Sequence, residues 1–374
     1  MKDCEKILIE AIKSTVCMND VRYKIPENQV ENVWDLACSH GFPGIVADIM
    51  INDSDYAKVK DFFKNEIFNL IKSSEKRNIQ LDTISKIFTE KNIPFIVLKG
   101  GVIKDFYPKD WYRTSSDLDI LVKEADLEAG IDALVQNNYY ICDRSGHDIS
   151  LKCDNGSVVE LHYVLVEIIK DAIPILDKVW EYSYKDGDHW KMTPEFFMYY
   201  HILHTAKHFI NGGCGIKPFI DMWLIEKNME IDYKLLENLL EKSGLLTFYK
   251  KIHYVMNVWF ENCLPNESSE RITKYIMEGG VYGNINARVA MHRGDGGKLN
   301  YILGRLFVPM YKLKASHSIL KKHPYLAPYF QVKRWIKVVT SGRVIKTANE
   351  IGINESMSEE ELSFISDLKK DLDI

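Results

Sequence analysis

The sequence predicts an α+β fold in which a small mixed β-sheet is flanked by helical N- and C-terminal regions. Apolar residues recur at helical spacing over residues 1–90 and again from Thr193 onwards, whereas short apolar or alternating runs fill residues 91–190. The order in that middle part is strand, helix, strand, helix and three strands, which fits a mixed sheet with helices packed on it. We therefore divide the chain into a helical region 1–90, an α/β core 91–190 and a helical region 191–374.

The N-terminal region is expected to contain several amphipathic helices. The first of them, at the very start of the chain, has acidic residues inside its apolar stretch, which is untypical of a signal peptide. The stretch Gly41-Phe42-Pro43 predicts a boundary between two helices, because glycine and proline interrupt helical backbone.

The middle region contains the predicted strands. A short apolar run ends in Gly100-Gly101, a short helix follows until Pro108, and Asp154-Asn155-Gly156 predicts a hairpin turn. The five predicted strands occupy residues 94–98, 115–123, 139–143, 147–153 and 157–166. A helix with Ala, Leu and Ile on one face is predicted at residues 124–138.

The C-terminal region is expected to be mainly helical. Thr193 is a plausible N-cap of a long helix, with Pro194 at its first position and Glu195 in its first turn. Further helices are predicted as far as Cys263, whereas the Gly-rich residues 278–298 predict an irregular connection.

Composition is typical of a soluble globular protein, with 46% hydrophobic and 27% charged residues and a net charge of −5. No apolar run approaches the roughly 20 residues that span a bilayer, so no integral membrane segment is predicted. The seven cysteines are odd in number, scattered and without a CxxC pair, which argues against a disulfide framework and a cysteine zinc site. A reducing cytoplasm is the simplest location for such a chain.

Three carboxylates form the candidate catalytic and metal-binding group. Asp117 and Asp119 are two residues apart in a predicted strand, so they face the same side about 7 Å apart. Carboxylates held this close repel each other unless a cation lies between them. Glu160, on a later alternating strand, could approach the same point, and magnesium prefers such oxygen ligands.

A phosphate site is predicted just upstream of these carboxylates. The turn Lys99-Gly100-Gly101 follows a buried strand, so its backbone N–H groups and the lysine charge could hold a phosphate. Arg113 could contact a triphosphate or pair with a carboxylate, and Ser116 directly precedes the aspartate pair. Together these parts are typical of phosphoryl or nucleotidyl transfer.

These motifs resemble a known family. FIVLKGGVIKDFYP, WYRTSSDLDILV, GHDISL and VVELHYVL are similar to an uncharacterised bacterial nucleotidyltransferase group of the DNA polymerase β-like nucleotidyltransferase superfamily. The resemblance extends over about residues 30–340 and is sharpest at 95–165. It implies a nucleotidyltransferase core in which Asp117, Asp119 and Glu160 bind Mg²⁺ or Mn²⁺.

The resemblance also implies a reaction: NMP moves from an NTP such as ATP to an unknown hydroxyl-bearing acceptor, and Glu160 takes the proton of that hydroxyl. The acceptor could be a small molecule, a protein or RNA. One departure concerns the first turn, where Gly100-Gly101 stands in place of the Gly-Ser usual in the superfamily. A catalytically degenerate module that binds a nucleotide or a partner is the alternative.

Histidines are further candidates for the acceptor site or the wall of the active site. His201, His204 and His208 share one helix face, and zinc binding and packing are the other interpretations. The resemblance includes this histidine-bearing helix and an aspartate that matches Asp221. His147 and His162 lie near the predicted hairpin and could face the site.

The segment 305–346 contains ten Lys or Arg and no Asp or Glu, and it is followed by an acidic tail at 350–373. Its basic and aromatic residues could suit nucleic acid or an anionic membrane surface. A solvated helix face, or charge balanced by the tail, is the plainer interpretation. The stretch 293–297 resembles a phosphate loop but lacks its strand and its Lys-Ser/Thr, which favours a flexible connection.

Overall fold

The chain is described by a computed structural model. It describes residues 1–18, 23–53, 56, 59–165, 169–293, 297–317, 319–340 and 343–374. Among them the backbone alone is described at 299, 300, 305, 315, 316, 321 and 343–347.

The N-terminal region is helical, as predicted. Its helices are α1 (Asp3–Val16), α2 (Val30–His40), α3 (Pro43–Asn52) and the long α4 (Lys60–Glu90). Gly41 ends α2 with a left-handed φ of 82°, and Pro43 opens α3, so the boundary predicted at this stretch is confirmed.

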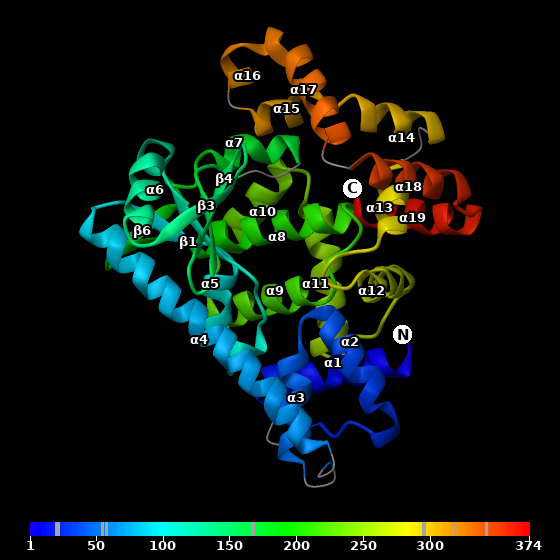
Figure 1. Cartoon of the computed structure of the whole chain (residues 1–374). Helices are drawn as coiled ribbons and strands as arrows, with labels where there is room; N and C mark the ends of the chain where they lie inside the picture. The colour runs from blue at the N-terminus through cyan, green and yellow to red at the C-terminus, as the bar shows by residue number, and fades with distance from the viewer. Residues whose placement is uncertain are drawn as a thin grey trace.

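A mixed sheet of seven strands forms the middle of the chain (Figure 1). The strands are β1 (Phe95–Val97), β2 (Leu118–Val122), β3 (Tyr139–Arg144), β4 (Asp148–Cys153), β5 (Val158–His162), β6 (Ser183–Asp186) and β7 (His189–Met192). Their order is β3-β4-β5-β2-β1-β7-β6, with β2–β5 and β1–β7 parallel and the other neighbours antiparallel. The predicted α+β fold with a small mixed sheet is therefore confirmed.

The hairpin of β6 and β7 was not among the five predicted strands. Its turn is Gly187-Asp188, and Gly187 has a φ of 61°, which is typical of a two-residue hairpin turn with glycine at its first position. The hairpin predicted at Asp154-Asn155-Gly156 is confirmed, since it joins β4 to β5 and Gly156 has a φ of 85°.

The two faces of the sheet are covered by different helices. Leu118, Ile120 and Val122 of β2 pack into an apolar cluster with residues of α4 and of α6 (Leu127–Val135). The opposite face of β2 holds Asp119 and Leu121, and Leu121 belongs to the main core of the protein. That core also contains residues of α1, α8 (Pro194–Ile210) and α19 (Glu359–Leu372), so it extends through all three predicted regions, whose division remains a prediction.

Short helices connect the strands, and longer ones form the C-terminal region. The short helices are α5 (Gly100–Ile103) and α7 (Ile173–Leu176). The C-terminal helices are α8 (Pro194–Ile210), α9 (Lys217–Asn228), α10 (Tyr233–Lys242), α11 (Leu246–Phe260), α12 (Glu267–Gly279), α13 (Ile285–Arg293), α14 (Gly297–Leu306), α15 (Met310–Ser316), α16 (Ile319–Lys322), α17 (Ala327–Thr340), α18 (Arg343–Ser356) and α19 (Glu359–Leu372). None of the helices in the described residues is long and apolar enough to cross a membrane.

The prediction of Thr193 as the N-cap residue of α8 is confirmed, with Pro194 at the first helical position and Glu195 in the first turn, although the Thr193 hydroxyl makes no capping hydrogen bond. One local prediction in this region needs correction. Most of 278–298 is helical instead of irregular, because α13 buries Val289, Ala290 and Met291, and this packing outweighs the helix-breaking glycines around it. The glycine loop predicted at 293–297 includes residues 294–296, which lie outside the described residues.

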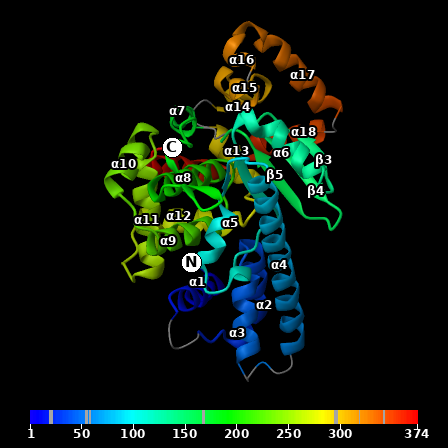
Figure 2. The same ribbon diagram turned by 90° about the vertical axis from the view of Figure 1, so that its left-hand side faces the viewer.

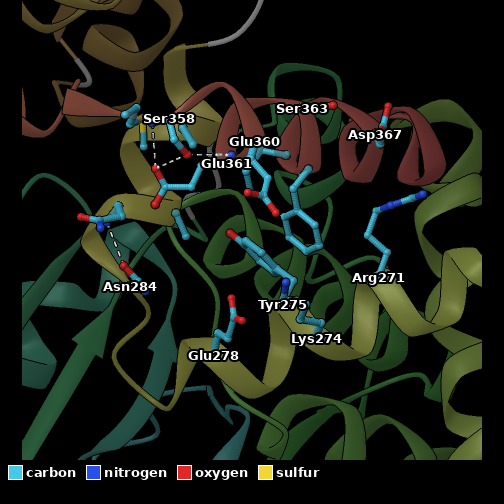
Figure 3. Close-up of a pocket in the computed structure, with 16 residues that line it drawn as sticks. Arg271, Lys274, Tyr275, Glu278, Asn284, Ser358, Glu360, Glu361, Ser363 and Asp367 are labelled. Atoms are coloured by element: carbon cyan, nitrogen blue, oxygen red, sulfur yellow. Dashed lines mark hydrogen bonds between the residues drawn. The ribbon is translucent and has the colours of Figure 1, made fainter. Parts of the chain in front are cut away.

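The acidic tail packs onto α12 and α13. Asp371 of α19 pairs with Arg271 of α12, and Glu350 of α18 pairs with Arg288 of α13. Between α12 and α19 lies a cavity of about 510 Å³ whose walls include Lys274, Tyr275 and Ser358 (Figure 3). The two ion pairs thus join Asp371 and Glu350 of the tail to α12 and α13.

Candidate active site

Asp119 and Glu160 lie side by side on adjacent strands. Asp119 of β2 is paired in register with Glu160 of β5, and these strands run parallel. Because residues two apart share a strand face, His162 lies on the same face as Glu160. This is the face that α8 covers in part, as Figure 2 shows from the side.

The three side chains converge on one point. His162 Nε2 lies 3.0 Å from Asp119 Oδ1 and 3.7 Å from Glu160 Oε2. One ligand atom from each of Asp119, Glu160 and His162 lies within 4.8 Å of the others. Among the described residues, these three side chains form the cluster whose ligand atoms lie close enough together to hold a metal ion.

The charges of this group are not balanced within it. Burial, and then the charges of Asp119 and Asp117, raise the pKa of Glu160 to about 7. Burial alone would also raise the pKa of Asp119, but the Lys99 ammonium and the His162 hydrogen bond hold that pKa well below its usual range. A cation beside Glu160 would relieve this crowding, so the donor set fits a divalent ion.

Asp117 and Ser116 lie next to this group and outside it. The strand begins at Leu118, so Asp117 directly precedes β2, and its carboxylate accepts a long hydrogen bond of 3.4 Å from Ser115 Oγ. Asp117 still acts on Glu160 through its charge. Ser116 is exposed in the turn before it. Both residues lie near the metal-type group, which is Asp119, Glu160 and His162. The role of Asp117 as a metal ligand and that of Ser116 as a nucleotide ligand remain predictions.

Lys99 has a strained backbone at the edge of the site. Its φ of 36° is unusual for a residue with a side chain, and such strain is concentrated at functional sites. Lys99 Nζ lies 3.8 Å from Asp119 Oδ2 and 5.7 Å from the centre of the Tyr200 ring. The turn therefore brings one positive charge directly to the carboxylate of β2.

The two glycines after Lys99 allow close packing. A Cβ on Gly100 would come within 2.5 Å of Arg113 Nη1, and one on Gly101 within 2.5 Å of Val97 Cγ1. Gly100 thus makes room for a guanidinium group beside the turn. The predicted contact of both glycines with a phosphate remains a prediction.

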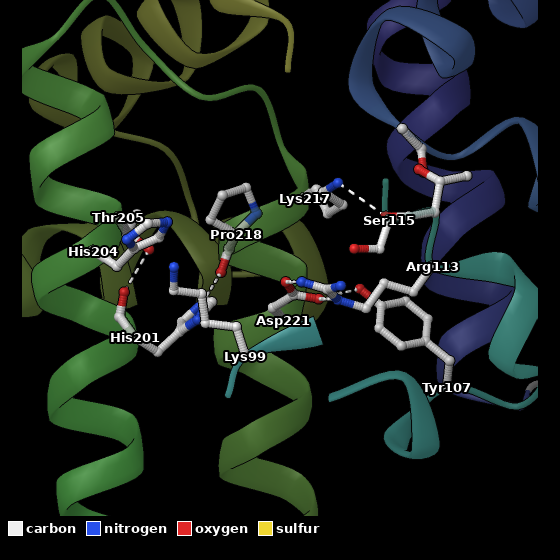
Figure 4. A network of polar contacts seen from close by, with 12 residues as sticks. Lys99, Tyr107, Arg113, Ser115, His201, His204, Thr205, Lys217, Pro218 and Asp221 are labelled. Atoms are coloured by element: carbon white, nitrogen blue, oxygen red, sulfur yellow. Dashed lines mark hydrogen bonds and ion pairs between the residues drawn. The ribbon is translucent and has the colours of Figure 1, made fainter. Parts of the chain in front are cut away.

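Arg113 is engaged by Asp221. Its Nε and Nη2 donate to the two Asp221 oxygens at 2.9 Å and 2.7 Å, and the Tyr107 hydroxyl donates to Asp221 at 2.7 Å (Figure 4). Asp221 is 1% exposed and Arg113 is 8% exposed. Of the two interpretations of Arg113 from the sequence, this geometry corresponds to pairing with a carboxylate.

Two basic residues that the sequence did not indicate hold the loop between Arg113 and β2. Arg77 of α4 donates to the Ser115 carbonyl at 2.8 Å, and Lys217 of α9 donates to the Thr114 carbonyl at 3.1 Å. Burial, and then the charge of Arg113, lower the pKa of Lys217 to about 8. The glycines of 212–215 before Lys217 were a signal for a special turn, whereas Arg77 has no local signal.

The three histidines of α8 have different surroundings. His201 is buried and its Nε2 donates to the Pro218 carbonyl at 2.8 Å, so it joins α8 to α9. His204 lies near Lys99, and burial followed by that charge lowers its pKa well below the usual value (Figure 4). His208 is exposed, with its Nε2 3.0 Å from that of His204.

His147 lies in the turn between β3 and β4, where the sequence predicted a strand. Its ring is 6.3 Å from that of His162, and its Nε2 is 2.9 Å from Asp148 Oδ2. It is therefore a neighbour of the metal-type group. Its role at an acceptor site remains a prediction.

Comparison with known proteins gives little similarity in structure. The Megavirus polyadenylate synthase has 14% sequence identity and a TM-score of 0.29, over 64% of this chain and 51% of that one. The chain thus spans about half the length of that structure. No curated protein matches the chain.

A family model gives the stronger result. The model described as uncharacterised nucleotidyltransferase matches residues 26–261, which is more than half of the chain and includes Lys99, Asp119, Glu160 and Asp221. The chain, with its paired strand carboxylates and its lysine–glycine turn, therefore belongs to the uncharacterised nucleotidyltransferase family.

Proposed function

We propose that this protein is a metal-dependent nucleotidyltransferase that moves NMP from an NTP to a hydroxyl-bearing acceptor, with Mg²⁺ or Mn²⁺ held by Asp119 and Glu160. The observation that carries the proposal is the register of β2 and β5, which pairs Asp119 with Glu160 and brings His162 to both. His162 would orient the Asp119 carboxylate through its 3.0 Å hydrogen bond. Asp117, one residue before the strand, is the third predicted ligand.

The other residues of the site would bind and orient the substrates. Lys99 would hold triphosphate oxygens beside the metal ligands, since its ammonium group lies 3.8 Å from Asp119 Oδ2. Glu160, with a pKa near 7, is suited to take the proton of the acceptor hydroxyl. A divalent ion bound here would supply charge neutralisation of the phosphate oxygens. We also propose that the protein is a bacterial member of the DNA polymerase β-like nucleotidyltransferase superfamily.

A second candidate function is a degenerate module that binds a nucleotide or a partner without turnover. It is favoured by one observation: Asp119 already has an ion pair with Lys99 and a hydrogen bond from His162. Pyrophosphate release separates the two functions, because only the enzyme produces it.

Calorimetry with each NTP and Mg²⁺ tests binding, and a pyrophosphate assay tests turnover. Radiolabelled NTP incubated with lysate, with and without RNase, then shows which kind of acceptor is labelled. We expect Asp119→Asn to lower turnover by about a thousandfold or more, equivalent to about 4 kcal/mol. The matched control is Asp143→Asn, which removes one carboxylate charge from the exposed part of β3. Absence of NTP binding by the wild type, or equal turnover in the two variants, would count against the proposal.

A further inference from the structure

Helix α17 has two different faces. On one face Ala327 is buried, Gln331 Nε2 donates to the Val308 carbonyl at 2.7 Å, and Trp335 Nε1 donates to the Leu306 carbonyl at 2.8 Å. These contacts attach α17 to the preceding segment. In both views α15 to α17 lie at one end of the molecule, away from α1 to α3 (Figures 1 and 2).

A second face of α17 is apolar and exposed. Tyr329, Val332, Ile336 and Val339 are spaced three or four residues apart, so they share one side of the helix. Tyr325 continues the row before the helix starts. These five side chains, here called the α17 stripe, are each between 47% and 71% exposed. A continuous row of this kind on a protein surface is typical of an interaction site.

Basic residues border the α17 stripe. Lys333 and Lys337 are exposed and each follows a stripe residue by one position, so they lie along one edge of it. The whole segment 305–346 contains ten Lys or Arg and no Asp or Glu. The acidic residues Glu350 and Asp371 of the tail pair with Arg288 and Arg271, both outside this segment.

We propose that the α17 stripe docks onto the surface of an anionic lipid bilayer, with α17 in the plane of the interface. Aliphatic side chains enter the boundary of the acyl chains, and lysines at the edge of the helix contact the negative headgroups. Charge complementarity favours an anionic partner, and the aliphatic residues favour a bilayer. Single-stranded nucleic acid stacks its bases on aromatic side chains, whereas three of the five stripe residues are Val or Ile.

Helix α4 offers a comparison within the same chain. It also exposes apolar residues, among them Phe68 and Ile79. Unlike α17, however, it intersperses six Lys or Arg with five Asp or Glu, so its positive charge is nearly balanced. Substitutions on α4 are therefore matched controls for substitutions on α17.

The test is co-flotation of the full chain with phosphatidylcholine vesicles, with and without phosphatidylglycerol. We expect binding only with phosphatidylglycerol, and weaker binding in higher salt. Lys333→Glu/Lys337→Glu should lower the partition constant by at least about tenfold. Val332→Ser/Ile336→Ser should lower it by about tenfold and leave the salt dependence in place.

The controls Lys72→Glu/Lys86→Glu and Ile79→Ser, all on exposed positions of α4, should bind as the wild type does. Circular dichroism checks that each variant is folded. The proposal is overturned if anionic vesicles do not float the protein or if the α4 and α17 variants bind equally. It is also overturned if the α17 stripe instead drives dimers in sedimentation velocity or binds single-stranded RNA while vesicles are ignored.

Discussion

Two carboxylate centres of this protein differ in how their charge is neutralised. Asp221 is buried with Arg113, which donates two hydrogen bonds to it, and Tyr107 donates a third. Glu160 is one third exposed and lies beside the carboxylate of Asp119. In the first centre the carboxylate charge is neutralised by Arg113, whereas in the second Lys99 and His162 neutralise Asp119 and the repulsion on Glu160 remains. The comparison indicates that Asp221 stabilises the fold and that Glu160 is available for a cation.

The sharpest way to break this comparison is to remove Asp221. Asp221→Ala leaves the buried Arg113 guanidinium without its partner, so we expect the free energy of unfolding to fall by about 3–5 kcal/mol. Chemical denaturation measures the loss. Arg113→Met combined with Asp221→Ala removes both charges and should recover part of it.

If Asp221→Ala instead leaves stability unchanged and abolishes NTP binding, Asp221 belongs to the substrate site and the contrast between the two centres is wrong. In that case the double variant would have no higher free energy of unfolding than Asp221→Ala.

The second change concerns Glu160, whose pKa is raised from 4.5 to about 7 in the folded protein. The folded protein holds this proton more tightly than the unfolded chain, which releases it near pH 4.5. The contribution of Glu160 to the free energy of unfolding is therefore complete below pH 4.5 and is lost as the pH rises through 7. Glu160→Gln should remove this loss, and after allowance for solvent exposure we expect a gain of about 1–2 kcal/mol in metal-free buffer above pH 7. Thermal unfolding across this pH range, with EDTA present, measures it.

Mg²⁺ should stabilise the wild type more than the Glu160→Gln variant. It should raise the unfolding temperature of the wild type above pH 7, and much less that of Glu160→Gln, because the amide is a weaker ligand than a carboxylate. Equal stabilisation of both by Mg²⁺ would show that Glu160 is not a ligand.

The smallest expected effect concerns Gly100, which packs against the Arg113 guanidinium. In Gly100→Ala the new methyl group meets Arg113 Nη1 at 2.5 Å, so we expect a loss of about 1 kcal/mol. Gly304→Ala in α14 is the control, since its added methyl group meets no atom within 4 Å beyond its chain neighbours and the backbone of its own helix. If NTP affinity falls while the free energy of unfolding does not change, Gly100 is needed for phosphate binding and not for the packing of Arg113.

Much of the site could be predicted because its signals are local. Asp119 and Glu160 lie in short strands with alternating apolar residues, and Lys99-Gly100-Gly101 follows a buried strand, so pattern and spacing indicate both. Arg77 and Lys217 could not be predicted in the same way. Each acts on a carbonyl more than 35 residues away in sequence, and nothing near Arg77 marks it on the long helix α4.

The sequence by itself determined the α+β class, the helical flanks, the hairpin at Gly156 and the family, because periodicity, glycine turns and motifs are properties of short segments. Only the tertiary structure decided that β2 and β5 pair in register, that His162 joins Asp119 and Glu160, and that Arg113 faces Asp221. The physical reason is that pairing of distant segments depends on which surfaces they bury together. For the same reason α13 forms a helix despite the glycines around it, since its buried face packs on the end of the chain.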